Sequence, residues 1–224
     1  MIPKIIWQTY ESEYNDLPEL AKDFSKTWIE KNPDWEYRYV SGKEREEFVL
    51  KNFGEEWHKI YMSYTTGVLR ADLWRYMCLY INGGVYSDLD ILCKKSIEYW
   101  LDTKLNFVVS EESPSSGYTQ MLFASSPNNI FLENILKDIK EQFYLNKKYK
   151  DIVNYVINEV GYLIFTNSIN KTLSMHSDGF MLYTGKDSKK IHEDSIQHYS
   201  AGSGNVFGLN YVAWKNEKIN KNDR

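Results

Sequence analysis

Cysteine is scarce in this chain, and long apolar runs are missing. Its 224 residues include only two cysteines, Cys78 and Cys93, which excludes a disulfide framework and a cysteine-rich zinc site. No run of 18 or more apolar residues occurs, and the first residues lack the apolar stretch of a signal peptide. We therefore expect no membrane span, a reducing environment and a cytoplasmic location.

An excess of basic charge is also missing. The net charge of -4 offers no positive footprint, so nucleic acid is not an expected partner. Apolar and aromatic residues are abundant instead, at 42% and 16% of the chain, which is ample for a packed core. We predict a single domain over residues 1–215 and a polar tail over residues 216–224 that frays.

Hydrophobic periodicity predicts strands that alternate with helices. Short β-rich runs at residues 4–8, 36–40 and 85–87 indicate strands, and the longest predicted helix spans residues 64–81. Further strands are predicted at residues 106–110, 120–124, 180–184 and 195–200, and helices at residues 17–31, 43–52, 55–62, 128–143, 151–157 and 162–170. This alternation predicts an α/β fold with a mostly parallel central sheet flanked by helices.

Two carboxylates follow the predicted strand at residues 85–87. In an extended chain, Asp88 and Asp90 point to one side while Leu89 turns to the core. Two carboxylates that converge beside a buried strand are costly unless a cation neutralises them, and Mg²⁺ or Mn²⁺ prefers such oxygen ligands. The end of a strand in an open α/β sheet is also where ligands bind. The alternative is a solvated acidic turn or a helix cap.

The helix at residues 64–81 is apolar around almost its whole circumference, which is typical of a buried helix. It nevertheless carries Asp72 and Arg75 on one flank, and buried charges need partners. They either pair with each other at i,i+3 or protrude at the metal site. In the second case Arg75 would face an anionic ligand and Asp72 would accept hydrogen bonds from sugar hydroxyls.

At this point the sequence resembles a known family. Residues 68–90, with Asp72, Arg75 and the Asp88-Leu-Asp90 motif, look like the core of the DXD sugar transferases. Residues 2–8 and 32–37 resemble the family's first blocks, so the likeness covers roughly the first half of the chain. The family is that of the yeast-type initiating α-1,6-mannosyltransferases (glycosyltransferase family 32-like), with bacterial and viral relatives. More distantly, it includes the glucosyltransferase domains of large clostridial toxins.

This resemblance implies a GT-A fold, a nucleotide-sugar donor, manganese (or magnesium) and retention of the anomeric configuration. By position, Asp88 and Asp90 correspond to the DXD carboxylates, with Asp88 reaching toward ribose and metal and Asp90 binding the metal. Asp72 and Arg75 match residues that bind the donor sugar and phosphates. Tyr86 falls where a tyrosine contacts the donor.

Two further segments carry weaker matches. Trp7, Gln8 and Thr9 end the first strand, where the nucleotide base packs in this fold, although Trp7 stands where many relatives have histidine and can equally be a core residue. His198 resembles a late histidine that supplies another metal ligand. The tryptophan that usually follows the family's late Gly-Ser is absent here, so Ser203 or Asn205 are alternatives to His198.

Together these features predict an enzyme, a retaining hexosyltransferase that moves a sugar from a UDP- or GDP-linked donor to a glycan or other hydroxyl acceptor. No catalytic nucleophile is nominated. Glu111 and Glu112 are acceptor-side candidates or part of a solvated loop, and residues 112–118 are a candidate flap. One rival is a sugar-nucleotide hydrolase, but the sequence lacks the His/Asp clusters that a two-metal hydrolase needs. The other rival is a calcium-dependent carbohydrate-binding module.

Overall fold

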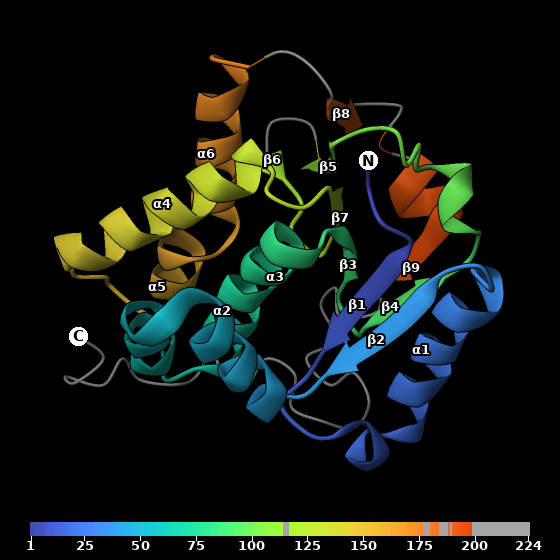
Figure 1. Cartoon of the computed structure of the whole chain (residues 1–224), viewed down its shortest axis with the longest axis horizontal. Coiled ribbons are helices and arrows are strands. Elements are labelled where there is room, and N and C mark those ends of the chain that lie inside the picture. Colours follow the sequence, from blue (N-terminus) through green and yellow to red (C-terminus); the bar gives the residue numbers. More distant parts are fainter. Residues whose placement is uncertain (114–116, 177–179, 184–187, 189, 199–224) are drawn as a thin grey trace.

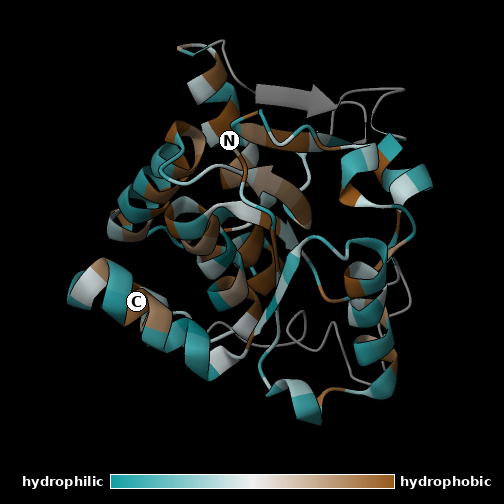
Figure 2. Cartoon of the chain, turned by 45° about the vertical axis from the view of Figure 1, so that its right-hand side comes forward, coloured by the Kyte–Doolittle hydropathy of each residue, from teal (hydrophilic) through white to brown (hydrophobic). Residues whose placement is uncertain are grey.

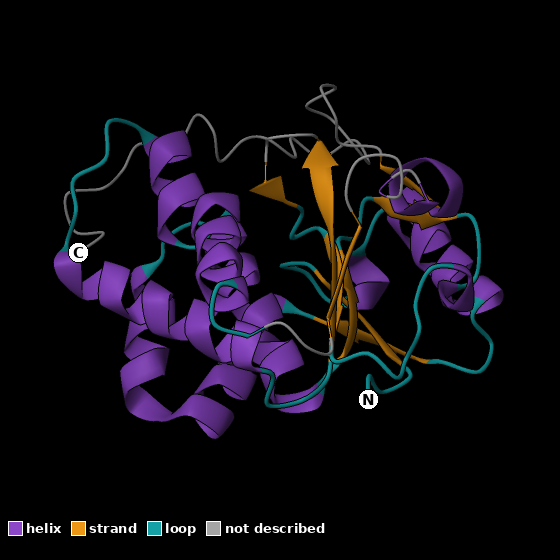
Figure 3. Ribbon diagram, turned by 90° about the horizontal axis from the view of Figure 1, so that it is seen from above, coloured by secondary structure: helices purple, strands orange, loops and turns teal. Residues whose placement is uncertain are grey.

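The computed structural model describes residues 1–113, 117–176, 180–183, 188 and 190–198. A sheet runs through the middle of this part of the chain, and helices cover it on both sides (Figures 1 and 3). Its strands are β1 (Ile5–Thr9), β2 (Glu36–Val40), β3 (Gly84–Ser87), β5 (Phe107–Ser113), β6 (Gly117–Tyr118), β7 (Leu122–Ser125) and β8 (Phe180–Tyr183). Their order is β2-β1-β3-β7-β5-β6, with β8 beside β5. The predicted α/β class is confirmed.

The sheet is mixed, which corrects the prediction of a mostly parallel sheet. Strand β1 lies parallel to β2 and β3, and β8 lies parallel to β5. Strand β7 runs antiparallel between β3 and β5, and β6 is antiparallel to β5. The apolar pattern of residues 120–124 predicted a strand there but carries no information on its direction. A separate antiparallel pair joins β4 (Ile91–Cys93) to β9 (Ile196–His198).

The helices follow the predicted pattern closely. They are α1 (Glu19–Lys31), α2 (Gly42–Ser63), α3 (Gly67–Asn82), α4 (Ile130–Leu145), α5 (Ile152–Glu159) and α6 (Tyr162–Leu173). The two helices predicted at residues 43–52 and 55–62 are the two halves of α2. They meet at a kink, because Gly54 has a non-helical backbone conformation with φ 78°. Ser41 and Glu44 cap the start of α2 with a reciprocal capping box. None of the described helices is long and apolar enough to cross a membrane.

The hydrophobic core lies on both faces of the sheet. One face packs against α2 to α6, and the other against α1 and the β4–β9 pair (Figure 3). In Figure 2 the hydrophobic colour gathers on interior segments, while the outer helices carry hydrophilic turns. Helix α3 is the innermost helix, as its apolar circumference predicted, and it delivers Asp72 and Arg75 to the interior. The division into residues 1–215 and 216–224 stays a prediction, since the tail lies outside the described residues.

Candidate active site

The two carboxylates of the DXD motif lie in a tight turn that joins β3 to β4. The Ile91 amide donates to Asp88 O at 3.3 Å, and the Asp88 amide donates to Met121 O at 2.8 Å, which ties the turn to the start of β7. Leu89 is buried against α1 residues, as predicted. The turn differs from the extended geometry expected from spacing alone. It still places both carboxylates at the C-terminal end of β3, where ligands bind in α/β sheets.

Arg75 connects the buried helix to this turn. Its Nη2 lies 2.7 Å from Asp72 Oδ1 and 3.2 Å from Asp88 Oδ1, and its Nη1 donates to Gln120 O at 2.9 Å. The guanidinium also lies 4.5 Å from the centroid of the Tyr86 ring, within cation–π range. Of the two readings that the sequence left open for Asp72 and Arg75, the structure realises the first, and of the second it realises only the reach of Arg75 to the acidic turn. They pair with each other, and Arg75 also reaches the acidic turn.

Asp72 lies beneath the turn rather than on the surface. Its Oδ2 accepts a 3.2 Å hydrogen bond from Gln120 Nε2. Burial raises the pKa of Asp72 to about 6, although Arg75 acts in the opposite direction. Since the side chain is almost fully buried, it positions Arg75 directly, and a sugar hydroxyl reaches it only if its surroundings open.

Tyr86 fixes the orientation of Asp88. The Tyr86 hydroxyl donates to Asp88 Oδ1 at 2.6 Å, and the tyrosine ring itself is buried. The Asp88 side chain keeps 21% of its surface exposed, so it can meet a ligand. Burial and the neighbouring Asp90 raise the pKa of Asp88, while Arg75 lowers it. A positive charge in addition to Arg75 would reduce the electrostatic repulsion between the carboxylates of Asp88 and Asp90.

Asp90 has the features of a cation ligand. Its side chain is 1% exposed, and its Oδ2 lies 3.2 Å from His198 Nε2. Its Oδ1 is buried and has no hydrogen-bond partner among the described residues. A buried carboxylate oxygen without a donor is costly, and a divalent cation satisfies it. Carboxylate and imidazole groups are both chemically suited to Mn²⁺.

The protein does not enclose this site by itself. Within the described part of the chain, no group of three His, Cys, Asp or Glu side chains is arranged so that it could hold a metal ion. An open arrangement suits Mg²⁺ and Mn²⁺ with substrate phosphates and waters as remaining ligands. His198 lies beside Asp90, as the late-histidine resemblance implied. The alternatives Ser203 and Asn205 lie outside the described residues.

The end of β1 braces the acidic turn. Gln8 is completely buried, and its amide donates to Asp88 O at 3.0 Å while it accepts from the Tyr37 hydroxyl at 2.8 Å. The Thr9 hydroxyl donates to Val40 O on β2 at 2.6 Å. Both side chains are thus engaged with the protein, and they hold the strand ends that line the site.

The structure corrects the prediction that Trp7 packs against a nucleotide base. Trp7 is 5% exposed, its indole donates to Gly83 O at 2.9 Å, and its ring meets Trp74 edge-on. The alternative of a core tryptophan describes it. The physical reason is strand alternation, which turns Trp7 toward α3 while Gln8 points to Asp88.

Gln120 is the site residue that sequence reasoning missed. It contacts Asp72 through its side chain and Arg75 through its carbonyl oxygen. Its position at the start of the strand predicted at residues 120–124 was visible in the sequence, but that strand's place beside β3 was not. Glu111, one of the two acceptor-side candidates, lies on β5 opposite Tyr118, and its carbonyl oxygen is 3.0 Å from His192 Nε2. The Glu112 side chain and most of the candidate flap lie outside the described residues.

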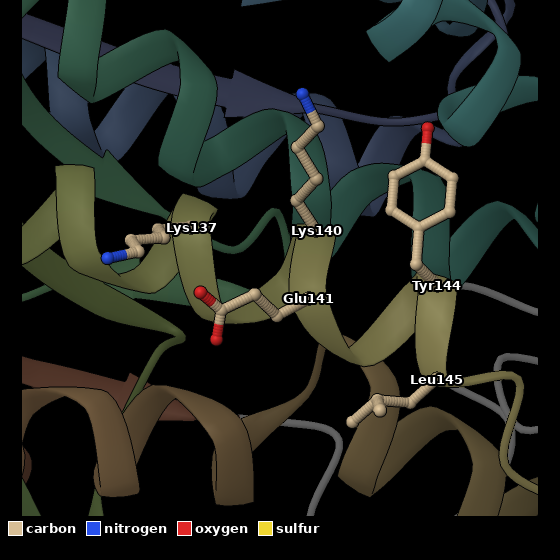
Figure 4. A pocket seen from close by; sticks show the side chains of 5 residues that line it. All are labelled: Lys137, Lys140, Glu141, Tyr144 and Leu145. Carbon is tan, nitrogen blue, oxygen red and sulfur yellow. The ribbon is translucent and has the colours of Figure 1, made fainter.

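A separate hollow of about 540 Å³ opens on the outer side of α4 (Figure 4). The residues that line it are Lys137, Lys140, Glu141, Tyr144 and Leu145. None of them belongs to the acidic turn or to its partners, so the hollow is not part of this site.

Comparison with known proteins supports a sugar transferase. Residues 18–107 match the family described as "Glycosyltransferase sugar-binding region containing DXD motif". An uncharacterised glycosyltransferase of Acanthamoeba polyphaga mimivirus is 25% identical over 221 residues, which cover 96% of this chain and 84% of that protein. The ligand-free glycosyltransferase domain of the YGT toxin superposes with a TM-score of 0.57 at 10% identity, covering 99% of this chain and 87% of that one.

Two yeast mannosyltransferases match part of the chain. Inositol phosphoceramide mannosyltransferase 3 of Schizosaccharomyces pombe is 33% identical over 141 residues, or 62% of this chain. The initiation-specific α-1,6-mannosyltransferase of Candida albicans is 30% identical over 103 residues, or 44% of this chain. The chain spans only 37% of the first protein and 27% of the second.

The fold and the acidic turn define a GT-A-like glycosyltransferase, which confirms the expected class. More particularly, residues 18–107 match the DXD family of sugar transferases, and the chain is similar over part of its length to two yeast mannosyltransferases.

Proposed function

We propose that this chain is a retaining, metal-dependent hexosyltransferase that takes its sugar from a UDP- or GDP-linked donor and passes it to a glycan or other hydroxyl acceptor. The observation that carries the proposal is the junction at the end of β3, where Arg75 pairs with Asp88 and the buried Asp90 has a carboxylate oxygen without a partner among the described residues. The names of the two yeast relatives favour mannose as the sugar.

The donor diphosphate would bind at this junction. Asp88 and Asp90 would hold Mn²⁺ or Mg²⁺, with His198 beside Asp90 as the candidate further ligand. The bound cation would supply Lewis-acid stabilisation of the departing nucleoside diphosphate. Arg75 adds a fixed positive charge beside Asp88, and its buried Nε has no hydrogen-bond partner among the described residues.

Asp72, Gln120 and Tyr86 would act by holding Arg75 and Asp88 in place before the donor arrives. Preorganised charges stabilise a developing charge without the cost of reorienting them during the reaction. No side chain at the junction is assigned as a nucleophile. We infer retention from the family resemblance, with the acceptor hydroxyl attacking from the face that the diphosphate leaves.

Two other functions fit the site less well. A hydrolase would use water as the acceptor, and the paired metal centre common in such enzymes has no counterpart among the described residues. A calcium-dependent carbohydrate-binding module would explain the acidic turn but gives no role to the buried Arg75 that reaches it.

A donor screen tests the proposal. The purified chain is incubated with Mn²⁺ and UDP-glucose, UDP-galactose or GDP-mannose, and released nucleoside diphosphate is measured with and without simple sugar acceptors. We expect Mn²⁺-dependent release from one donor, stimulated by an acceptor, and a product that keeps the donor's anomeric configuration on NMR. Release that no acceptor stimulates would favour a hydrolase. Binding of free glycan with Ca²⁺, and no release at all, would favour the module.

A further inference from the structure

Gln120 is held by three side chains from one turn of α3. Its side-chain amide donates from Nε2 to Asp72 Oδ2 at 3.2 Å, and its backbone carbonyl oxygen accepts from Arg75 Nη1 at 2.9 Å. At the other end of the amide, Oε1 accepts a hydrogen bond from the Tyr76 hydroxyl. The first two contacts belong to the proposed diphosphate site, whereas the chemistry proposed for that site assigns no role to Tyr76.

The Tyr76 ring is fixed by its packing. Tyr76 is 0% exposed, and its ring stacks on that of Phe165 of α6, with the ring centroids 5.4 Å apart and an angle of 11° between the planes. The ring also lies against Phe123 of β7, with the centroids 6.2 Å apart. Close packing in a protein core leaves such a ring little room to change its rotamer. The position of the Tyr76 hydroxyl is therefore set by the ring.

The Tyr76 hydroxyl acts as a hydrogen-bond donor at this place. Burial raises the pKa of Tyr76 well above its ordinary value, so the hydroxyl keeps its proton at neutral pH. Besides Gln120 Oε1, it lies 3.0 Å from the carbonyl oxygen of Val160, the C-cap residue of α5. Both neighbouring atoms are acceptors, so the single hydroxyl proton is shared between them.

The partners of the Gln120 amide fix its orientation. An ionised carboxylate only accepts hydrogen bonds, so Asp72 requires the NH₂ end of the amide, and the Tyr76 donor requires the oxygen end. Removal of the tyrosine hydroxyl would take this donor from Oε1. The amide would then be free to turn its oxygen toward the carboxylate of Asp72, which repels it.

The segment that carries Gln120 supports both Arg75 and Asp88. Its carbonyl oxygen accepts from Arg75, and the carbonyl oxygen of the next residue, Met121, accepts from the Asp88 amide at 2.8 Å. A displaced Gln120 would therefore disturb the support of both residues. Since Arg75 Nη2 lies only 3.2 Å from Asp88 Oδ1, the arrangement of charges at the junction depends on this support.

We propose that Tyr76 is a positioning residue of the transfer reaction, which acts through Gln120 to hold Arg75 in place beside Asp88. This inference rests on the proposed function, because it assumes that Arg75 faces the diphosphate of a nucleotide-sugar donor. Negative charge grows on the diphosphate as the glycosidic bond breaks, so a misplaced Arg75 costs more in the transition state than in the bound donor. The Tyr76 hydroxyl should therefore support turnover rather than donor binding.

The Tyr76→Phe variant tests the residue, because it keeps the packed ring and removes only the hydroxyl. kcat per folded molecule and KM are measured with Mn²⁺ and whichever of UDP-glucose, UDP-galactose and GDP-mannose the wild type turns over. The assay runs at about pH 8, where Asp72 is ionised. We expect kcat to fall about tenfold, as the loss of one buried hydrogen bond implies, while KM changes by less than about twofold. An unchanged kcat, or a rise in KM alone, would contradict the proposal.

Tyr61→Phe is the matched control. Tyr61 lies on α2 and is also buried, at 1% exposed, but its hydroxyl has no hydrogen-bond partner among the described residues. The same substitution there should keep the wild-type kcat and KM. If Tyr61→Phe lost as much turnover as Tyr76→Phe, the loss would be a general effect of removing a core hydroxyl, and the assignment would be overturned.

A double-mutant cycle tests whether Tyr76 acts through Gln120. Gln120→Met removes both amide hydrogen bonds and keeps the backbone carbonyl group that accepts from Arg75. Alone, it should lower kcat at least as much as Tyr76→Phe. Adding Tyr76→Phe to Gln120→Met should then lower kcat by less than about twofold further, because residues that act through one contact are not additive. A second fall as large as that in the wild-type background would mean that Tyr76 acts by another route, which would overturn the proposal.

These outcomes distinguish the role of Tyr76 from the proposed function. If the wild type turns over none of the three donors, the proposed transferase function fails, and the role of Tyr76 falls with it. If the wild type is active and Tyr76→Phe matches it, the transferase stands and only the role of Tyr76 is wrong.

Discussion

Arg75 holds together the acidic groups of this site, and each of its contacts has a different origin in the sequence. Its pairing with Asp72 follows from i,i+3 spacing on a helix and could be predicted. Its contact with Asp88 was one of two predicted possibilities, decided by how β3 packs beside α3. Its bond to Gln120 could not be predicted, because it depends on where β7 enters the sheet.

Asp72 gives the metal-free chain a pH-dependent stability that Asp72→Asn should remove. Because burial raises its pKa to about 6, the native state binds more protons than the unfolded state between about pH 4 and 6. Stability from this group is therefore greatest at low pH and is lost as the pH rises through about 6. In thermal melts from pH 4.5 to 7, wild type should decline relative to Asp72→Asn. Parallel profiles for the two proteins would show that Asp72 is not buried as described.

At the level of elements, β3 is the part that places the site. It lies parallel to β1 and antiparallel to β7, so three strand ends meet around Asp88. The sequence predicted the strand from its apolar residues and the stop of α3 from Asn82-Gly-Gly. The antiparallel direction of β7 depends on tertiary packing that periodicity does not encode. The same packing decides that the face of β1 with Trp7 turns to the core.

Gly84 sets how closely β1 and β3 approach. Its φ is 106°, and an added Cβ would lie 2.6 Å from Ile5 O and 3.0 Å from Trp7 Nε1. Backbone strain alone costs roughly 1–3 kcal/mol, and the clash with β1 adds to it. Gly84→Ala should therefore lower the free energy of unfolding, measured in urea, by more than about 1 kcal/mol.

Gly54→Ala is the matched comparison. Gly54 also has positive φ, but no atom lies within 4 Å of an added Cβ, so only backbone strain applies. Gly84→Ala should be clearly the more destabilising of the two. Equal losses would mean that the contact between β1 and β3 is looser than the structure indicates.

At the scale of the whole molecule, the class and order of the elements could be predicted, because apolar periodicity reports burial. The mixed direction of the strands could not, since direction is set by connections and packing. The candidate site divides in the same way. The acidic turn and the charges of α3 come from contiguous sequence, whereas Gln120 joins them from a distant segment.

The two cysteines report whether the described sheet and helices unfold together. Cys78 lies on α3 and Cys93 on β4, on opposite faces of the sheet, and both are buried. Burial raises the pKa of both thiols, that of Cys93 to about 11, so few thiolates form at neutral pH. Both should react slowly with a thiol reagent in buffer and become reactive over the same urea range. Early labelling of one cysteine alone would show that its face opens independently.

The most direct test of the central claim measures whether the Asp88–Asp90 turn binds a nucleotide through a metal ion. Thermal stability of wild type and Asp90→Asn is recorded with GDP or UDP, each with and without Mn²⁺. Since a bound ligand stabilises the native state, wild type should melt at a higher temperature only when Mn²⁺ and a nucleotide are both present. Asp90→Asn should fold but lose this increase. An undiminished increase in Asp90→Asn would contradict the account.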